Sequence, residues 1–204
     1  MDSTSYKTET RRLESFHGDD KKKIFSMLRE AFSENFTSLL DDFQLERYLL
    51  EVNYGVNIAN ITIVKNKDNL VGLAIVGQQV SLIRCLLHYE HPLGFLKFII
   101  RCLASFKILN SSLINVLSRK NNETPLSEEN SLYLSYICID NEQHRKGLGS
   151  LLMETLISNL KLSNTDVLYC HMDSTSPQVR GFYQSHGWNI ESYAVRSAAW
   201  LDVK

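Results

Sequence analysis

The chain has 204 residues, 44% of them hydrophobic and 22% charged, which is the balance of an ordinary soluble globular protein. Its formal net charge of -1 provides no global field that would attract nucleic acid, so we expect no nucleic-acid partner. No apolar run reaches the roughly 20 residues needed to span a bilayer, and the N-terminal stretch lacks the apolar core of a secretory signal. These observations predict a cytoplasmic protein with one domain over residues 1–204.

The four cysteines are scattered along the sequence, with no CxxC pair and no histidine at ligand spacing. Cys138 and Cys170 fall inside predicted strands, where a buried free thiol is the expected state. We therefore predict no metal.

Two amphipathic helices follow a polar N-terminal segment. In "DDKKKIFSMLREAFSENF" one face carries Ile24, Phe25, Leu28 and Phe32. "DDFQLERYLLEVNYG" repeats the spacing with Phe43, Leu45, Tyr48, Leu49 and Val52. The periodicity then changes to two β-rich runs, about 57–65 and 70–77, joined by the polar turn at 66–69, which predicts a hairpin.

Residues 81–120 form the most individual part of the sequence. They are rich in Leu, Ile and Phe, and they hold six Lys or Arg against one acid, Glu90. Helical spacing in pieces predicts a helical insertion at about 80–120, within a longer insertion at 80–130. Three interpretations stay open: a helical hairpin packed on the domain or in a homodimer interface, a lid over an acceptor site, or a surface that contacts a membrane or a partner. The apolar character of most faces favours burial, which ranks membrane contact last.

Regular alternation begins at residue 131. A strand at 131–139, a helix at about 147–161, a strand at 166–172, a helix at about 177–186 and a final β pair within 188–203 follow one another. Alternating strands and helices predict an α/β sandwich in which helices cover a sheet.

The junction "NEQHRKGLGS" connects the first of these strands to its helix. The first N–H groups of a helix have no intrahelical partners and lie at the positive end of the helix dipole. Gly147 and Gly149 carry no Cβ, so a phosphate can approach these N–H groups, and Arg145 and Lys146 add positive charge. The stretch has the design of a pyrophosphate cradle, although glycines also serve as ordinary turn residues. It is neither a Walker loop nor a dinucleotide fingerprint.

A second motif lies about 30 residues on, in "SPQVRGFYQSHGW". Together with Gly147 and Gly149, the positions Ser176, Tyr183, Gly187 and Trp188 resemble the GNAT superfamily of acyl-CoA-dependent N-acyltransferases. There the first motif reads Q/R-x-x-G-x-G/A and the second reads N-x-x-A-x-x-x-Y followed by a glycine and an aromatic residue. This chain departs at three positions, with His144 for Q/R, Ser176 for Asn and Val179 for Ala. The resemblance is motif-specific over about 131–188.

The resemblance implies a GNAT-like fold, a central mixed and mostly antiparallel sheet with a splayed central strand pair and helices on both faces. Acetyl-CoA would enter between the strands 131–139 and 166–173. Cofactor contacts would come from Ile137, Ile139, His144, Arg145, Lys146, Gly147, Leu148, Gly149, Ser150, Ser176 and Tyr183. The N–H of Ile137 would polarise the thioester carbonyl. Tyr183 would protonate the departing thiolate as the catalytic acid.

The general base stays open: His171 and Asp173 are candidates, and Tyr136 or Ser135 could line the acceptor side. The activity implied is transfer of an acetyl group from acetyl-CoA to a primary amine of a small-molecule or peptide acceptor, by direct attack in a ternary complex. The alternative is a non-catalytic CoA-binding sensor or scaffold that acts through the basic insertion.

Overall fold

The computed structural model describes residues 6–33, 36–53, 60–79, 100, 130–173, 176–192 and 196–203. The predicted insertion at 80–130 therefore lies outside the described residues, apart from positions 100 and 130. Its helical character and the three interpretations of it stay predictions. Among the described residues, no helix is both long enough and apolar enough to cross a bilayer.

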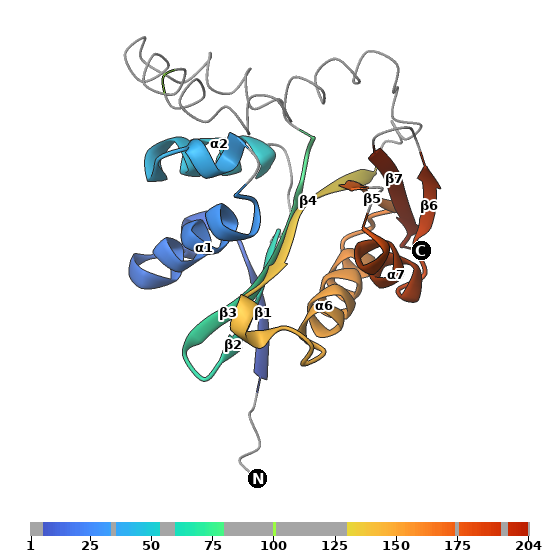
Figure 1. The fold of residues 1–204 in the computed structure, drawn as a ribbon, viewed down its shortest axis with the longest axis horizontal. Helices are drawn as coiled ribbons and strands as arrows, with labels where there is room; N and C mark the ends of the chain where they lie inside the picture. The colour runs from blue at the N-terminus through green and yellow to red at the C-terminus, as the bar shows by residue number, and fades with distance from the viewer. Residues whose placement is uncertain are drawn as a thin grey trace.

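The described residues contain one seven-stranded sheet with the strand order β1-β2-β3-β4-β5-β7-β6 (Figure 1). The strands are β1 (Tyr6–Arg11), β2 (Ile61–Asn66), β3 (Asn69–Gly77), β4 (Ser131–Ile139), β5 (Val167–Asp173), β6 (Asn189–Ser192) and β7 (Arg196–Asp202). Only β4 and β5 run parallel to each other, and the other five neighbouring pairs are antiparallel. The predicted mixed, mostly antiparallel sheet is confirmed.

Helices cover both faces of this sheet. In Figure 1, α1 (Gly18–Ala31) and α2 (Asp42–Asn53) lie on one side, and α6 (Leu148–Leu162) and α7 (Pro177–Ser185) lie on the other. Three short 3-10 helices complete the described elements: η1 (Leu13–Ser15), η2 (Phe36–Leu39) and η4 (Asn141–Gln143). From residue 131 to 186, every predicted strand and helix is present with bounds within one residue of the expectation.

Each face of the sheet has its own hydrophobic core. Alternation along β3 sends Leu73 and Ile75 into the cluster beneath α1 and α2, and Ala74 and Val76 into the cluster beneath α6 and α7. All four side chains are fully buried. The central strands are therefore covered on both faces, which explains their continuous apolar runs.

The apolar face predicted for α2 is wrong at one position, because the side chain of Phe43 is 57% exposed. Leu45, Leu49 and Val52 are fully buried, so they set the buried face of the helix. Phe43 precedes Leu45 by two residues, or about 200° around the axis, and so lies on the opposite side. The guanidinium of Arg47 stacks on its ring at 5.3 Å from the centroid.

Strand β1 was not predicted, because its sequence YKTETR has no apolar face. It pairs with β2 at the edge of the sheet, from Tyr6 opposite Asn66 to Arg11 opposite Ile61. Polar contacts hold it on both sides. Toward α6, the hydroxyl of Thr10 lies 3.0 Å from that of Thr62 and accepts from Asn159 at 2.6 Å.

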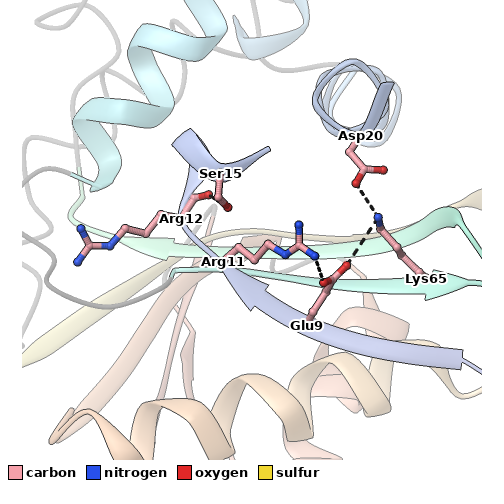
Figure 2. A network of polar contacts seen from close by, with 6 residues as sticks. All are labelled: Glu9, Arg11, Arg12, Ser15, Asp20 and Lys65. Carbon is pink, nitrogen blue, oxygen red and sulfur yellow. Dashed lines mark hydrogen bonds and ion pairs between the residues drawn. The ribbon is translucent and has the colours of Figure 1, made fainter. Parts of the chain in front are cut away.

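On the other side of β1, Lys65 of β2 connects two elements (Figure 2). Its Nζ lies 2.6 Å from a carboxylate oxygen of Asp20 in α1 and 3.6 Å from one of Glu9, which also pairs with Arg11. The Lys65 side chain is 18% exposed, so these ion pairs are partly shielded from water. An edge strand can be held by such pairs without apolar side chains of its own.

We predict that Leu152→Ala destabilises the protein by about 2–5 kcal/mol, because Leu152 is fully buried in the cluster beneath α6 and its truncation leaves a cavity. The free energy of unfolding in urea measures this. Leu162→Ala is the matched control at the end of the same helix, where the side chain is 87% exposed, and it should change stability by less than about 0.5 kcal/mol. Equal losses in both variants would contradict the packing described here.

Candidate active site

Strands β4 and β5 pair only at their beginnings. The parallel register joins Ser131 to Val167, Leu132 to Leu168 and Tyr133 to Tyr169, and it extends no further. We call the following stretch, β4 beyond Tyr133 and β5 beyond Tyr169, the strand fork. The fork confirms the splayed central strand pair expected from the sequence.

A bulge in β4 lies at the start of the fork. On β3, Ile75 pairs with Tyr136 and the next residue, Val76, pairs with Leu134, so Ser135 is an extra residue in β4. A bulge bends its strand and increases the local twist. The bend coincides with the point at which β4 leaves β5.

The backbone of Ile137 and Ile139 faces the fork. The N–H of Asp140 donates to the carbonyl of Val71 at 2.8 Å, which makes Asp140 and Val71 a hydrogen-bonded pair at the end of the β3–β4 ladder. Such pairs alternate along an antiparallel ladder, so the polar backbone groups of Ile137 and Ile139 point away from β3. This is the orientation that pairing with an extended ligand requires.

Helix α6 follows β4 in the chain after η4 and a short loop, and Gly147 is its N-cap. Gly147 has φ 74° and ψ 4°, a left-handed conformation that glycine adopts without strain. No side chain caps this end and no acidic residue lies in the first turn, so side chains leave the first N–H groups uncapped. The side chains of Arg145 and Lys146 are exposed beside it. These features fit an anion.

The two motif glycines have different structural reasons. An added Cβ on Gly147 would meet nothing within 4 Å, so its backbone angle alone requires glycine. An added Cβ on Gly149 would lie 3.3 Å from the ring of Phe182, so Gly149 also allows α6 to approach α7 closely. Leu148 buries its side chain in the core and can offer a ligand only its backbone, while Ser150 is partly exposed in the first turn.

His144 contacts the fork through its ring. Its Nε2 lies 3.0 Å from the carbonyl oxygen of Ile139, and because a carbonyl only accepts, Nε2 carries the proton in this contact. The neighbouring Asp140 accepts from Lys23 of α1 at 2.9 Å, which lowers the pKa of that carboxyl. The loop between β4 and α6 is thus tied to both the strand and α1.

Helix α7 begins at the same edge of the sheet as α6, because β4 and β5 are parallel neighbours. Ser176 is its N-cap and accepts from the N–H of Val179 at 3.4 Å. Tyr183, on the last turn, is buried. Its ring makes edge contacts with Trp188 at 4.8 Å and Phe182 at 5.5 Å between centroids.

The phenol of Tyr183 lies beside the thiol of Cys170 on β5, close enough for each group to shift the pKa of the other. Burial, and then the neighbouring Cys170, raise the pKa of Tyr183 well above its ordinary value. Cys170 is the first residue of β5 beyond the paired Tyr169, so the phenol lies at the start of the fork. The sequence identified Cys170 only as a buried thiol, although alternation along β5 could have placed it on the α7 face.

Tyr136, expected on the acceptor side, and His171, a candidate for the general base, lie in two environments. Tyr136 packs in the core beneath α1, with its ring 4.9 Å from that of Phe32. His171 alternates with Cys170 along β5, and its ring lies 5.8 Å from that of Tyr133. The choice of a general base stays a prediction. Among the described residues, no group of three or more histidine, cysteine or acidic side chains could hold a metal ion.

A comparison with protein families matches residues 114–190 to the acetyltransferase (GNAT) domain. The described part of this match runs from β4 through α6, β5 and α7 into β6, which are the elements that form the fork and both helix starts. These residues are similar to a GNAT acetyltransferase domain. No curated protein sequence matches it closely enough to count as a relative.

Solved structures share the GNAT fold over nearly the whole chain. Ard1 from Thermoplasma volcanium has a TM-score of 0.59 at 11% identity and covers 98% of each chain. The ribosomal-protein-S18-alanine N-acetyltransferase from Escherichia coli has a TM-score of 0.56 at 12% identity, covering 98% of this chain and 95% of its own. The putative acetyltransferase yncA from Salmonella typhimurium, solved with its cofactor acetyl-CoA, has a TM-score of 0.59 at 9% identity and the same coverage. These structures have the same fold as this chain, and the family match covers residues 114–190.

We predict that Gly147→Ala destabilises the GNAT domain by about 1–2 kcal/mol, since alanine must adopt a positive φ at this position. Urea unfolding measures the change. Gly181→Ala is the control, because Gly181 lies exposed inside α7 with a negative φ and open space for a Cβ. That control should gain about 0.5–1 kcal/mol through helix propensity. A stability loss from Gly181→Ala that equalled the loss from Gly147→Ala would contradict a special backbone requirement at the cradle.

We also predict that alkaline pH destabilises the domain. Burial raises the pKa of Cys138 and of Cys170 from 9.0 to about 12, so the folded state holds both thiol protons more tightly than the unfolded state. This stability is complete below pH 9 and is lost as the pH rises toward 12, by up to about 1.4 kcal/mol per thiol and pH unit. Unfolding free energies between pH 8 and pH 10.5, in the presence of a reductant, measure the slope. Cys170→Ala should make the slope shallower; an unchanged slope would contradict the assignment.

Proposed function

We propose that this chain transfers an acetyl group from acetyl-CoA to a primary amine by direct attack within a ternary complex. The observation that carries the proposal is that three features lie along the strand fork. These are the uncapped start of α6, the unpaired backbone of Ile137 and Ile139, and the phenol of Tyr183 at the start of the fork.

The residues fit a ligand that combines a diphosphate with an extended amide chain. The N–H groups of Leu148, Gly149 and Ser150 would hold the diphosphate, with Arg145 and Lys146 adding charge from solvent. The backbone of Ile137 and Ile139 would then pair with the amides of the chain as a neighbouring strand would. Since His144 already donates to the carbonyl of Ile139, this pairing would use the remaining groups, namely the Ile139 N–H and both groups of Ile137.

When bound, acetyl-CoA supplies an acetyl group activated as a thioester. The N–H of Ile137 would donate to the thioester oxygen, where negative charge develops during attack. Tyr183 would donate its phenolic proton to the departing sulfur. Because its pKa is raised, Tyr183 stays protonated throughout the neutral range and can act as an acid there.

The experiment that tests this function measures binding and turnover separately. Calorimetric titration of the parent with acetyl-CoA tests binding, and release of free CoA with a panel of amines tests turnover. The panel contains spermidine, glucosamine, a peptide with a free N-terminus, and an N-terminally blocked peptide with one lysine. Absence of acetyl-CoA binding would rule out the proposal, and tight binding without turnover on any amine would favour the sensor or scaffold.

We predict that Tyr183→Phe lowers kcat by about 100-fold or more while the dissociation constant of acetyl-CoA changes by less than about twofold, since phenylalanine keeps the packing and removes the acid. In the parent, deprotonation of Tyr183 should not lower kcat below pH 10, because the raised pKa of this phenol moves its deprotonation to higher pH.

The control for this variant is Tyr6→Phe, which removes a phenol from β1 at the edge of the sheet. Its kcat should equal that of the parent. A Tyr183→Phe enzyme with parental kcat would remove Tyr183 from the mechanism.

A further inference from the structure

The hydroxyl of Ser135 is buried and has no hydrogen-bond partner among the residues that the structure describes. Two other buried polar atoms of the described residues share this state, Asn66 Oδ1 in the β2–β3 hairpin and Trp188 Nε1 behind Tyr183. Leaving a buried hydroxyl unpaired costs stability, and such groups in native proteins usually have a reason outside the packing. Of the three, only Ser135 lies in the strands that form the fork.

Ser135 lies where the strands separate. It is the extra residue of the β4 bulge. Tyr133 is the last residue of β4 that pairs with β5, Leu134 follows it, and Ser135 comes next. On β5 the first position beyond this pairing is Cys170, which lies beside the phenol of Tyr183. The backbone that faces the fork, at Ile137 and Ile139, begins two residues further along β4. A chain bound from the α6 start inward along this backbone would have its thioester at Ile137, two residues from Ser135.

The side chains at this level lie on opposite faces of the sheet. Leu134 joins the cluster beneath α6 and α7, so alternation places Ser135 on the α1 and α2 face. Tyr136 also joins the cluster beneath α1 and α2, because the bulge shifts the alternation by one residue. Tyr183 reaches the fork from the α7 side.

The α6 and α7 face offers no approach to an acceptor at this level. Tyr183, Leu152, Met153 and Leu168 fill it as buried core residues. An amine that attacks opposite Tyr183 would therefore come from the face that carries Ser135, where the residue as a whole is partly exposed although its Oγ is covered.

We propose that Ser135 is a catalytic residue that positions the acceptor amine: its Oγ accepts a hydrogen bond from the N–H of the attacking amine and aims the nitrogen lone pair at the thioester carbonyl carbon. This inference rests on the proposed acetyl transfer. The C–N bond forms on the Ser135 side and the C–S bond breaks on the Tyr183 side, with the phenolic proton passing to the sulfur. A serine hydroxyl is too weak a base to take the amine proton. The amine therefore releases its proton to solvent, and the Tyr183 phenolate takes up a proton from solvent. Because Oγ offers a single short contact, the acceptor class is an unhindered primary amine.

Kinetics with the amine panel test the proposal. Ser135→Ala should lower kcat/KM for the amine about tenfold, the effect of one lost hydrogen bond, while the dissociation constant of acetyl-CoA stays within about twofold. Ser135→Thr keeps the hydroxyl and should recover part of the loss. The matched control is Ser158→Ala on the exposed face of α6, which should behave as the parent. Parental kcat/KM in Ser135→Ala would overturn the proposal.

Thermal unfolding of the same variants provides an outcome that needs no acceptor. Removing an unpaired buried hydroxyl should leave the Tm of Ser135→Ala equal to that of the parent or raise it. A lower Tm would show that Ser135 has a structural partner and would overturn the proposal even if no amine in the panel were acetylated. Failure of the parent to bind acetyl-CoA would instead reject the proposed function, so the two failures are distinguishable.

Discussion

β4 separates from β5 at the point where β4 carries one extra residue. Without the bulge at Ser135, the two parallel strands would have continuous edges able to pair along their full length, and the backbone of Ile137 and Ile139 would be used up within the sheet. The bulge removes β4 from β5 while β4 stays paired with β3. One side of β4 is thus paired with β3 within the sheet, and the other side has unpaired backbone groups. The proposed backbone contacts with the thioester use these unpaired groups.

The two faces of the sheet support the fork in different ways. On the α6 and α7 face, a continuous apolar cluster holds both helices and buries Tyr183 against Trp188. On the α1 and α2 face, the end of β4 is held by polar contacts, chiefly the ion pair between Lys23 and Asp140. Apolar packing therefore holds the side chains around Tyr183, whereas an ion pair and hydrogen bonds hold the end of β4. His144 belongs to the second group, since its ring ties the loop back to the strand that it follows.

Much of the fold could be predicted because the spacing of apolar residues along the sequence indicates the strands and helices. The strands and helices after residue 131 have apolar patterns, a glycine N-cap and a serine N-cap that agree with one another, and the structure has them within one residue. Strand β1 could not be found this way, because Thr10 and Glu9 are held by Asn159 and Lys65, and both partners are distant in sequence.

The site shows the same distinction between local and long-range information. The glycines at the start of α6 and the cations beside them belong to a local motif that the sequence shows directly. The left-handed conformation of Gly147 is seen only in the structure. The contact between Tyr183 and Cys170 joins two elements whose relative position no local pattern contains. The bulge at Ser135 was equally hidden, since its sequence reads as an uninterrupted strand and only the register with β3 shows the extra residue.

The polar character of β1 has a consequence for the behaviour of the protein in concentrated solution. β1 is the outermost strand of the sheet in the described part of the chain, and exposed strand edges are templates on which further chains can add. Its charged residues, Lys7, Glu9 and Arg11, alternate along that edge, and any incoming strand would have to desolvate them. A sequence with more apolar residues here would have been easier to recognise as a strand, but it would also have invited edge-to-edge aggregation.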